Sequence, residues 1–223
     1  MARKQHVNVI YEDNHILVAE KPVNIVSQAD STKDLDFLNI CKNYIKNKYN
    51  KPGNVYLGLI HRLDRPVAGL MVFAKSSKAA SRLSDQMRQR KIDKKYIAIL
   101  QGTLNTIEDQ LVSYIKKNPI KNISTVKTRS FEGAKKAILN YKLIRMEGRH
   151  SIVEVKLETG RPHQIRAQFS HIGHPILGDR KYGAKKEFNN NKGIALYSTH
   201  LSFKHPVKDE VMSFDLKPKW FKA

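Results

Sequence analysis

The chain has 223 residues, 40% of them hydrophobic, so it is long enough to bury the core of one compact domain. Its 41 Lys and Arg residues against 20 Asp and Glu residues give a formal net charge of +21, which favours a polyanionic partner, although a lysine-rich proteome also produces basic proteins that bind none. A single cysteine excludes an intramolecular disulfide, and no apolar run approaches the ~20 residues of a membrane span. From these two features we expect a cytoplasmic protein.

Apolar periodicity predicts the elements of the N-terminal half. Alternating or β-rich apolar runs indicate strands, and apolar positions three or four residues apart indicate helices. Cys41 lies on the apolar stripe of the first helix and should pack as a small hydrophobe. The expected elements are strands at Val7–Tyr11 and His15–Glu20, a helix at Leu35–Tyr49, strands at Val55–His61 and Leu70–Ala74, a helix at Lys78–Arg90 and a strand at Tyr96–Leu100.

The C-terminal half is predicted to contain mainly strands. Pro162 suits the first turn of a helix whose buried face carries Ile165, Phe169 and Ile172. The other expected segments are strands at Leu111–Ile115, Lys136–Arg145, Ser151–Glu158 and Ile194–Phe203, and a mobile surface loop at Lys185–Lys192. Because strands outnumber helices and hairpin-like spacing recurs, we predict an α+β fold with a largely antiparallel sheet.

A carboxylate flanked by arginines is the first candidate for chemistry. Asp64 lies in the polar loop Arg62–Gly69, directly after a predicted strand, with Arg62 and Arg65 beside it. Neighbouring guanidinium groups favour the charged carboxylate, which is the state that a nucleophile or a general base needs. A structural ion pair that caps the turn explains the same residues, so the local pattern leaves both roles open.

A second candidate is the basic start of the predicted C-terminal helix. Arg161, His163 and Arg166 surround this helix N-terminus, where an anion would be stabilised, although a solvated basic helix end is an equal explanation. Nine histidines are present, but no metal-binding spacing gathers them, and His171 with His174 indicates a helix exit. We therefore expect no metal site.

Three segments together resemble a known family. They are HRLDRPVAGLMVFAK from His61, KKYIAIL from Lys94, and LETGRPHQIRAQFSHIGHPILGDRKYG from Leu157. Their residues and order are similar to the RluA-type family of pseudouridine synthases, and the resemblance covers nearly the whole chain. It implies one pseudouridine-synthase-like catalytic domain over residues 1–223, with a mostly antiparallel mixed sheet flanked by helices.

The resemblance also implies catalytic roles. The aspartate of HRLD, here Asp64, would be the nucleophile. The tyrosine after KK, here Tyr96, would lie against the target base and shuttle a proton, although locally it looks like an ordinary sheet residue. The last arginine of GRPHQIR, here Arg166, would pair with the catalytic aspartate and keep it ionised.

Further positions are implied to bind RNA or the base. Arg62 would contribute to RNA binding and base extrusion, Ile165 would line the uracil pocket, and Arg161 and His163 would lie near the site. One departure is Ala68, where the family usually has Ser or Thr. We expect the lost hydroxyl to weaken a loop hydrogen bond worth about 1 kcal/mol without removing a catalytic group.

The implied activity is isomerisation of uridine to pseudouridine in ribosomal RNA, transfer RNA or both. We expect no cofactor, no membrane association, no obligate protein partner and a monomer. Many relatives carry a separate RNA-binding domain ahead of the catalytic one, and the strands predicted within 7–20 leave no space for it. Two alternatives are a non-catalytic RNA-binding or ribosome-assembly module on the same fold, and a methyltransferase, which would need a Gly-rich loop near those strands.

Overall fold

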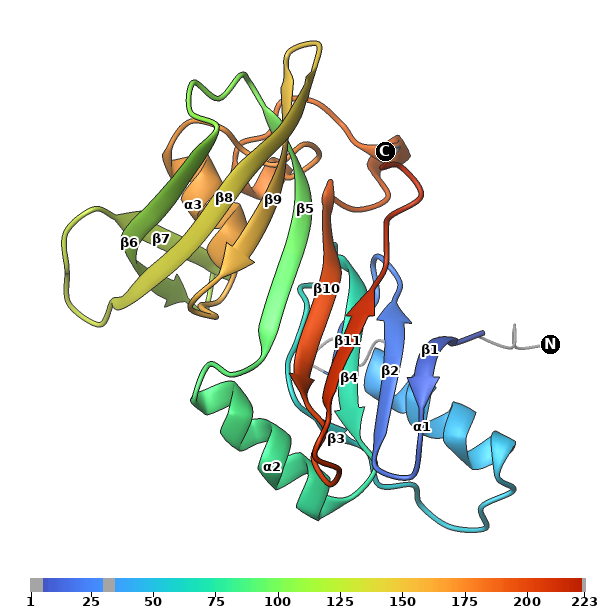
Figure 1. Ribbon diagram of the computed structural model, residues 1–223. Helices are drawn as coiled ribbons and strands as arrows, with labels where there is room; N and C mark the ends of the chain where they lie inside the picture. The colour runs from blue at the N-terminus through green and yellow to red at the C-terminus, as the bar shows by residue number, and fades with distance from the viewer. Residues whose placement is uncertain (1–5, 30–34, 222–223) are drawn as a thin grey trace. The chain divides into compact units, whose positions relative to one another are not determined.

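The computed structural model describes residues 6–29 and 35–221, whose strands and helices are shown in Figure 1. By its internal packing the chain divides into two compact units, of which unit 1 is Met1–Ile92 with Ser198–Ala223 and unit 2 is Asp93–Tyr197. The strand pairs whose register is described are all antiparallel, and helices pack on strands in both units. The predicted α+β fold with a mainly antiparallel sheet is confirmed, and a single domain over the whole chain stays a prediction.

Unit 1 is a sheet with a helix against each face of its central strands. Strands β1, β2, β4 and β10 follow one another in this order, while β3 pairs with β4 and β11 with β10. The elements of this unit are β1 (Asn8–Glu12), β2 (Ile16–Lys21), α1 (Phe37–Lys48), β3 (Gly58–Leu59), β4 (Ala68–Ala74), α2 (Ser77–Arg88), most of β10 (Leu196–Lys204) and β11 (Val211–Asp215).

The two faces of β2 and β4 are buried by different helices. Val18 and Val72 lie opposite each other and pack in one core cluster with Leu83 of α2. On the other face Phe73 contacts Phe37 of α1, with ring centroids 5.7 Å apart. Because side chains alternate along a strand, a sheet covered on both faces has continuous apolar strands.

Both helices of unit 1 begin at a local capping residue. Asp36 accepts a hydrogen bond from the backbone N–H of Asn39 at 3.0 Å, and Ser76 accepts one from Ala79 at 3.2 Å. Such caps satisfy N–H groups that have no partner inside the helix. The two predicted helices are therefore confirmed, with ends shifted by one or two residues, and Cys41 is fully buried as expected.

Unit 2 is a five-stranded antiparallel sheet with α3 on one face. Its strand order is β5, β9, β8, β6 and β7, and α3 contacts β6 and β7. Tyr141 of β8 meets Phe169 of α3 with ring centroids 5.6 Å apart. The elements are β5 (Asp93–Gln101), β6 (Glu108–Asn118), β7 (Ile123–Lys127), β8 (Lys135–Glu147), β9 (His150–Leu157), α3 (Gln164–His171) and the 3-10 turns η1 (Arg180–Tyr182) and η2 (Asn189–Asn191).

Three sequence predictions need correction. The strand expected at Val55–His61 is only β3, because beyond it His61 meets β4 through its side chain and the backbone N–H of Leu63 donates to Ser27 Oγ. Ile172 does not extend the buried face of α3, since the helix ends at His171 and Ile172 is 38% exposed. Pro162 precedes the helix, whose N-cap is His163.

Candidate active site

Asp64 lies in a loop of unit 1 whose two neighbouring residues are anchored. Ser27 Oγ donates to the carbonyl of Leu63 at 2.7 Å and accepts from the N–H of Leu63 at 3.0 Å. On the other side the carbonyl of Arg65 accepts from the N–H of Asn24 at 2.8 Å. Asp64 is thus a half-buried carboxylate between two fixed points, as a positioned reactive group requires.

The ends of this loop are held as well. At its start, the N–H of Val72 on β4 donates to His61 Nε2 at 3.1 Å. At its end, Gly69 has a φ of +123°, and a Cβ there would lie 2.3 Å from the backbone oxygen of Ser198. Only glycine fits at Gly69, because an L side chain would collide with β10. Arg62 is exposed on the same loop.

Tyr96 lies on β5 of unit 2, where it is 6% exposed and faces Val155 of β9 across the strand pair. Lys94 lies two residues earlier and therefore points to the same side of the strand. Burial lowers the pKa of Lys94 below its ordinary value. Tyr96, which looked like an ordinary sheet residue in the sequence, thus has the partly desolvated ammonium group of Lys94 beside it on the same face of β5.

The segment before α3 is held by the side chain of Gln164, which is 3% exposed. Its Oε1 accepts from the N–H of Arg161 at 2.9 Å and from Thr159 Oγ1 at 2.8 Å. Its Nε2 donates to the carbonyl of Ile138 at 3.0 Å. Arg161 Nε in turn donates to the carbonyl of Lys136 at 2.9 Å, so this turn is tied to β8.

His163 adopts a left-handed backbone conformation, with a φ of 54°, at the N-cap of α3. Its Nδ1 lies 2.8 Å from Tyr182 Oη, and that oxygen also accepts from the N–H of Ser124 at 2.8 Å. Burial raises the pKa of Tyr182, so its hydroxyl keeps the proton that it can donate to His163. His163 therefore joins the start of α3 to η1.

Arg166 is a buried cation with a matched partner. It is 5% exposed, and its Nε and Nη2 contact Asp179 Oδ2 and Oδ1 at 2.7 and 2.9 Å. Its guanidinium carbon lies 5.0 Å from the ring centroid of Tyr182. A solvated basic helix end is therefore the wrong explanation for Arg166, although that alternative was open from the sequence.

The partner Asp179 was not foreseen, and it links the TGRPHQIR and GDRKYG motifs. The contact is bidentate and uses two of the five N–H groups of the guanidinium. The expected pairing of Arg166 with Asp64 stays a prediction. Ile165 is 5% exposed and forms part of the apolar interior, and its contact with a uracil also stays a prediction.

The predicted residues therefore fall into two groups. Arg62 and Asp64 share a loop of unit 1, and the others belong to unit 2, namely Tyr96, Arg161, His163, Ile165 and Arg166. Sequence reasoning missed Lys21, Ser27 and Asp179, which contact these segments. The available signals were the lysine before a proline at the end of an apolar strand and the position of Asp179 inside the family-like segment from Leu157.

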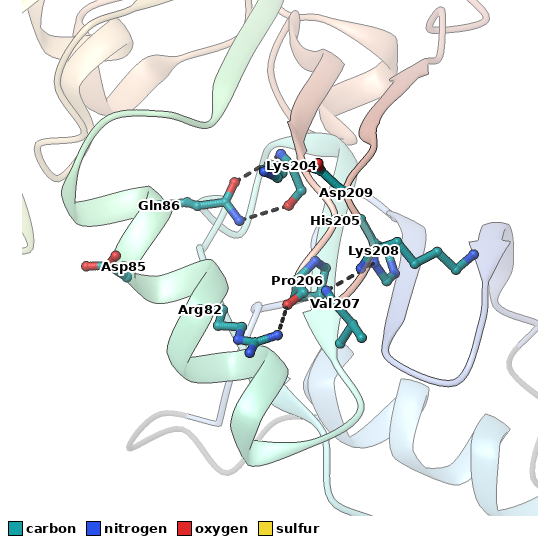
Figure 2. A pocket seen from close by; sticks show the side chains of 9 residues that line it. All are labelled: Arg82, Asp85, Gln86, Lys204, His205, Pro206, Val207, Lys208 and Asp209. Carbon is teal, nitrogen blue, oxygen red and sulfur yellow. Dashed lines mark hydrogen bonds and ion pairs between the residues drawn. The ribbon is translucent and has the colours of Figure 1, made fainter.

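Figure 2 shows a surface pocket of about 430 Å³ between α2 and the turn from β10 to β11 in unit 1. Gln86 exchanges two hydrogen bonds with the backbone of Lys204, at 2.8 and 3.0 Å, and Arg82 donates to the carbonyl of Pro206 at 2.6 Å. None of the predicted site residues lines it. We interpret these hydrogen bonds as structural, because they hold α2 against the turn between β10 and β11.

Two searches of the described residues concern other kinds of site. Within residues 6–29 and 35–221, no group of three or more His, Cys, Asp or Glu side chains is placed to hold a metal ion. In the same part of the chain, the helices are too short or too polar to cross a membrane.

Comparisons with known proteins concern the family and the fold. A family model described as RNA pseudouridylate synthase matches residues 15–171. A ribosomal large subunit pseudouridine synthase D of Buchnera aphidicola (Schizaphis graminum) is 37% identical over 93% of this chain and 68% of that protein. An uncharacterized RNA pseudouridine synthase of Aquifex aeolicus is 35% identical over 97% of this chain and 71% of that protein. The solved structure of human RNA Pseudouridylate Synthase Domain Containing 4 covers 96% of this chain and 90% of its own, with a TM-score of 0.79 and 22% identity, and shows the same fold.

Proposed function

The chain belongs to the RNA pseudouridylate synthase family, and from this premise we propose that it modifies uridines of large-subunit ribosomal RNA with Asp64 as its nucleophile. As a member of this family it is an isomerase that acts on uridine in RNA. The name of the Buchnera relative supports the ribosomal substrate. The observation that carries the role of Asp64 is its anchoring between Leu63 and Arg65 inside the matched family region.

The chemistry needs no electron donor or acceptor. The N1–C1′ bond of uridine breaks, the uracil rotates, a C5–C1′ bond forms, and the C5 proton leaves while N1 gains one. Asp64 either attacks C1′ or removes a proton from the ribose, and both routes require an ionised carboxylate. A target uridine must be flipped out of folded RNA at a cost of a few kcal/mol, which contacts between basic side chains and phosphates offset.

The other site residues orient Asp64, contact the base or bind the RNA. Arg166 holds the carboxylate of Asp64 ionised and oriented, and its bidentate contact with Asp179 fixes the orientation of the guanidinium. Tyr96 lies against the extruded base and helps to remove the C5 proton. Ile165 covers the base with an apolar surface. Arg62 contacts the RNA where the base leaves the stack.

The test maps pseudouridines in ribosomal and transfer RNA from cells with and without this protein. We expect sites in large-subunit ribosomal RNA to disappear, to return with the wild-type gene, and to stay absent with Asp64→Asn. Asp85→Asn is the matched control, because Asp85 lies on α2 in the same unit and should restore the sites.

Each outcome has a separate meaning for the proposal. Restoration by Asp64→Asn rejects Asp64 as the nucleophile. Loss of pseudouridines from transfer RNA alone contradicts the ribosomal substrate and leaves the catalytic assignment in place. An unchanged map in every RNA contradicts both parts.

A further inference from the structure

The helix α1 and the turn that follows it form a segment of unit 1 without acidic residues. Residues 37–63 contain no Asp or Glu, although the chain has 20 of them elsewhere. The same segment contains five asparagines and four lysines, the lysines being Lys42, Lys46, Lys48 and Lys51. A generally basic chain does not require such a local exclusion of acids, so the segment itself calls for a physical reason.

The polar residues of α1 share one side of the helix. Its buried side chains are Phe37, Leu38, Ile40, Cys41 and Ile45. On the opposite side Asn39, Asn43 and Lys46 are exposed, and Lys42 is half-buried. These four follow one another at spacings of three or four residues, so they lie along one face. We call this set, together with Lys51, the α1 face.

The α1 face carries a charge that the helix does not balance. Lys42 and Lys46 lie four residues apart, where like charges destabilise a helix and an acidic partner would stabilise it. The other helix of unit 1 has such a pair, Asp85 with Arg88. The helix dipole favours the lysines in the last turn of α1 but not Lys42. An unbalanced positive face is useful where a polyanion supplies the missing charge.

The end of α1 keeps a further lysine close to this face. Asn50 has a φ of 48°, and the backbone N–H of Lys51 donates to the carbonyl of Lys46 at 3.0 Å. This is the hydrogen bond of a Schellman turn, which folds the chain back over the last helical turn. The backbone of Lys51 is therefore fixed next to that of Lys46, and the positive charge continues past the end of the helix.

The acid that contacts this end of the helix is already neutralised. Glu12 of β1 has a side chain that is 4% exposed, and it pairs with Lys48 and Lys75 at 2.7 Å each. The hydroxyl of Tyr49 donates to the same carboxylate at 2.9 Å. Two ammonium groups thus face one carboxylate, so Glu12 anchors the helix end without cancelling the charge of the α1 face.

The other end of α1 lies beside the loop of Asp64. The backbone N–H of Leu38 donates to the carbonyl of Ser27 at 3.2 Å. Ser27 Oγ in turn holds Leu63, the residue before Asp64, at 2.7 Å. From there α1 runs for 12 residues, which is a length of about 18 Å. The α1 face therefore begins near the reacting group and extends away from it.

We propose that the α1 face binds the sugar–phosphate backbone of the substrate RNA at nucleotides beyond the target uridine. The lysines contact phosphates, and the asparagines bond to phosphate or ribose oxygens, contacts that position RNA without reading its sequence. The inference rests on the RNA substrate of the proposed function and not on the role of Asp64.

The test removes three charges at once, in a Lys42→Gln, Lys46→Gln and Lys51→Gln triple variant, because Gln keeps the helix propensity of Lys. The probe is large-subunit ribosomal RNA purified from cells that lack this protein. At ~0.1 M salt Kd should rise by ~10–100-fold, and the slope of log Kd against log salt should become shallower by ~2–3. In the pseudouridine assay the loss should appear in KM and not in kcat.

The matched control is a Lys78→Gln, Lys91→Gln and Lys208→Gln triple variant, which removes the same charge from exposed positions of the same unit. Its Kd should stay within ~3-fold of the wild type, since non-specific attraction depends only weakly on three distant charges. Equal losses in both triple variants would mean that net charge alone matters and would overturn the proposal. Circular dichroism checks that both variants fold, and the single variant Lys46→Glu should weaken binding more than Lys46→Gln.

A crosslinking experiment identifies what the α1 face touches. A photoreactive group on Lys46→Cys, introduced while the natural Cys41 is buried, should capture RNA in ribosomal particles from cells that lack the protein. Capture of a ribosomal protein and not of RNA would overturn the proposal.

Asp64→Asn separates this inference from the proposed nucleophile. If Asp64→Asn is active while the α1 triple variant binds weakly, only the nucleophile has failed. If Asp64→Asn is inactive while the α1 triple variant binds as its control does, only the α1 face has failed.

Discussion

The loop of Asp64 in unit 1 and the segment before α3 in unit 2 are both held in place by buried side chains, but the buried cation near each has a different kind of partner. Each is tied to its surroundings by one buried side chain that bonds to the backbone, Ser27 in unit 1 and Gln164 in unit 2. They differ in how they bury a cation. Lys21 rests on backbone carbonyls, whereas Arg166 has a matched carboxylate in Asp179.

This difference determines how each segment responds to pH. A guanidinium cannot lose its proton in proteins, so the Arg166–Asp179 pair keeps its charges through the neutral range. Lys21 has a pKa lowered to about 7, so its charge changes within that range. The Arg166–Asp179 pair of unit 2 therefore keeps the same charges across this range, while the charge of Lys21 in unit 1 changes with pH.

The largest effect should come from breaking the matched pair. Arg166→Met leaves Asp179 buried without its partner, which should cost about 3–5 kcal/mol of unfolding free energy. Activity should fall by ~100-fold or more if, as the proposed function has it, Arg166 orients the carboxylate of Asp64. Urea denaturation and a pseudouridine assay measure the two quantities.

The exposed Arg180, which pairs with Glu187 in the same unit, is the matched control. Arg180→Met should stay within ~0.5 kcal/mol of the wild type, as substitutions at the surface usually do. If Arg166→Met resembles Arg180→Met in both stability and rate, the Arg166–Asp179 pair contributes no more than a surface ion pair, and the contrast with Lys21 is wrong.

An intermediate effect should follow from removing the two backbone ties. Gln164→Ala and Ser27→Ala each leave buried backbone groups without partners, at about 1–3 kcal/mol, and Gln164→Ala should be the more costly because it removes three hydrogen bonds. Ser27→Ala should also slow the reaction by ~10-fold, since Asp64 loses one of its anchors. Thermal unfolding and single-turnover rates test both.

Ser213→Ala, at an exposed serine of β11, controls for the loss of a hydroxyl. It should leave both quantities unchanged. A Ser27→Ala protein with the wild-type rate would show that Asp64 needs no support from this segment.

The smallest effect concerns a matched cluster inside unit 1, at Glu12. Burial acts to raise the pKa of this carboxyl, but hydrogen bonds from Lys48, Lys75 and Tyr49 outweigh it and lower the pKa to about 2. A lowered pKa stabilises the fold above the unfolded value and loses that contribution as the pH falls through about 2. Glu12→Gln should therefore cost about 1–2 kcal/mol at neutral pH, reduced by solvent around the exposed Lys48.

Urea denaturation of wild type and Glu12→Gln at several pH values checks this prediction. The difference between the two proteins should shrink from about pH 5 toward pH 2. Glu210→Gln, at an exposed glutamate of the same unit, should show no such trend. A constant difference across the range would mean that Glu12 contributes by packing and not by charge.

Local patterns were sufficient for much of the fold. The two helices of unit 1 follow from apolar spacing and from the caps Asp36 and Ser76, which act within three residues. The strands β7 and β11 were missed, because neither has a buried apolar face: Ser124 is the one buried residue of β7, and β11 has none. The strand predicted at Val55–His61 ends at Leu59 in the structure. Beyond it, the backbone N–H of Leu63 donates to Ser27 Oγ and not to a neighbouring strand.

By itself the sequence determined the fold class and the family, and it supplied Asp64, Tyr96 and Arg166 as the proposed catalytic residues, since these follow from periodicity and from motifs of contiguous residues. Only the tertiary structure revealed that Arg166 pairs with Asp179 and that Lys21 reaches the carbonyl of Arg65. These contacts join residues 13 and 44 positions apart. A charge has no periodic pattern that names its partner, and burial, which decides how strongly the two interact, is a property of the packed chain.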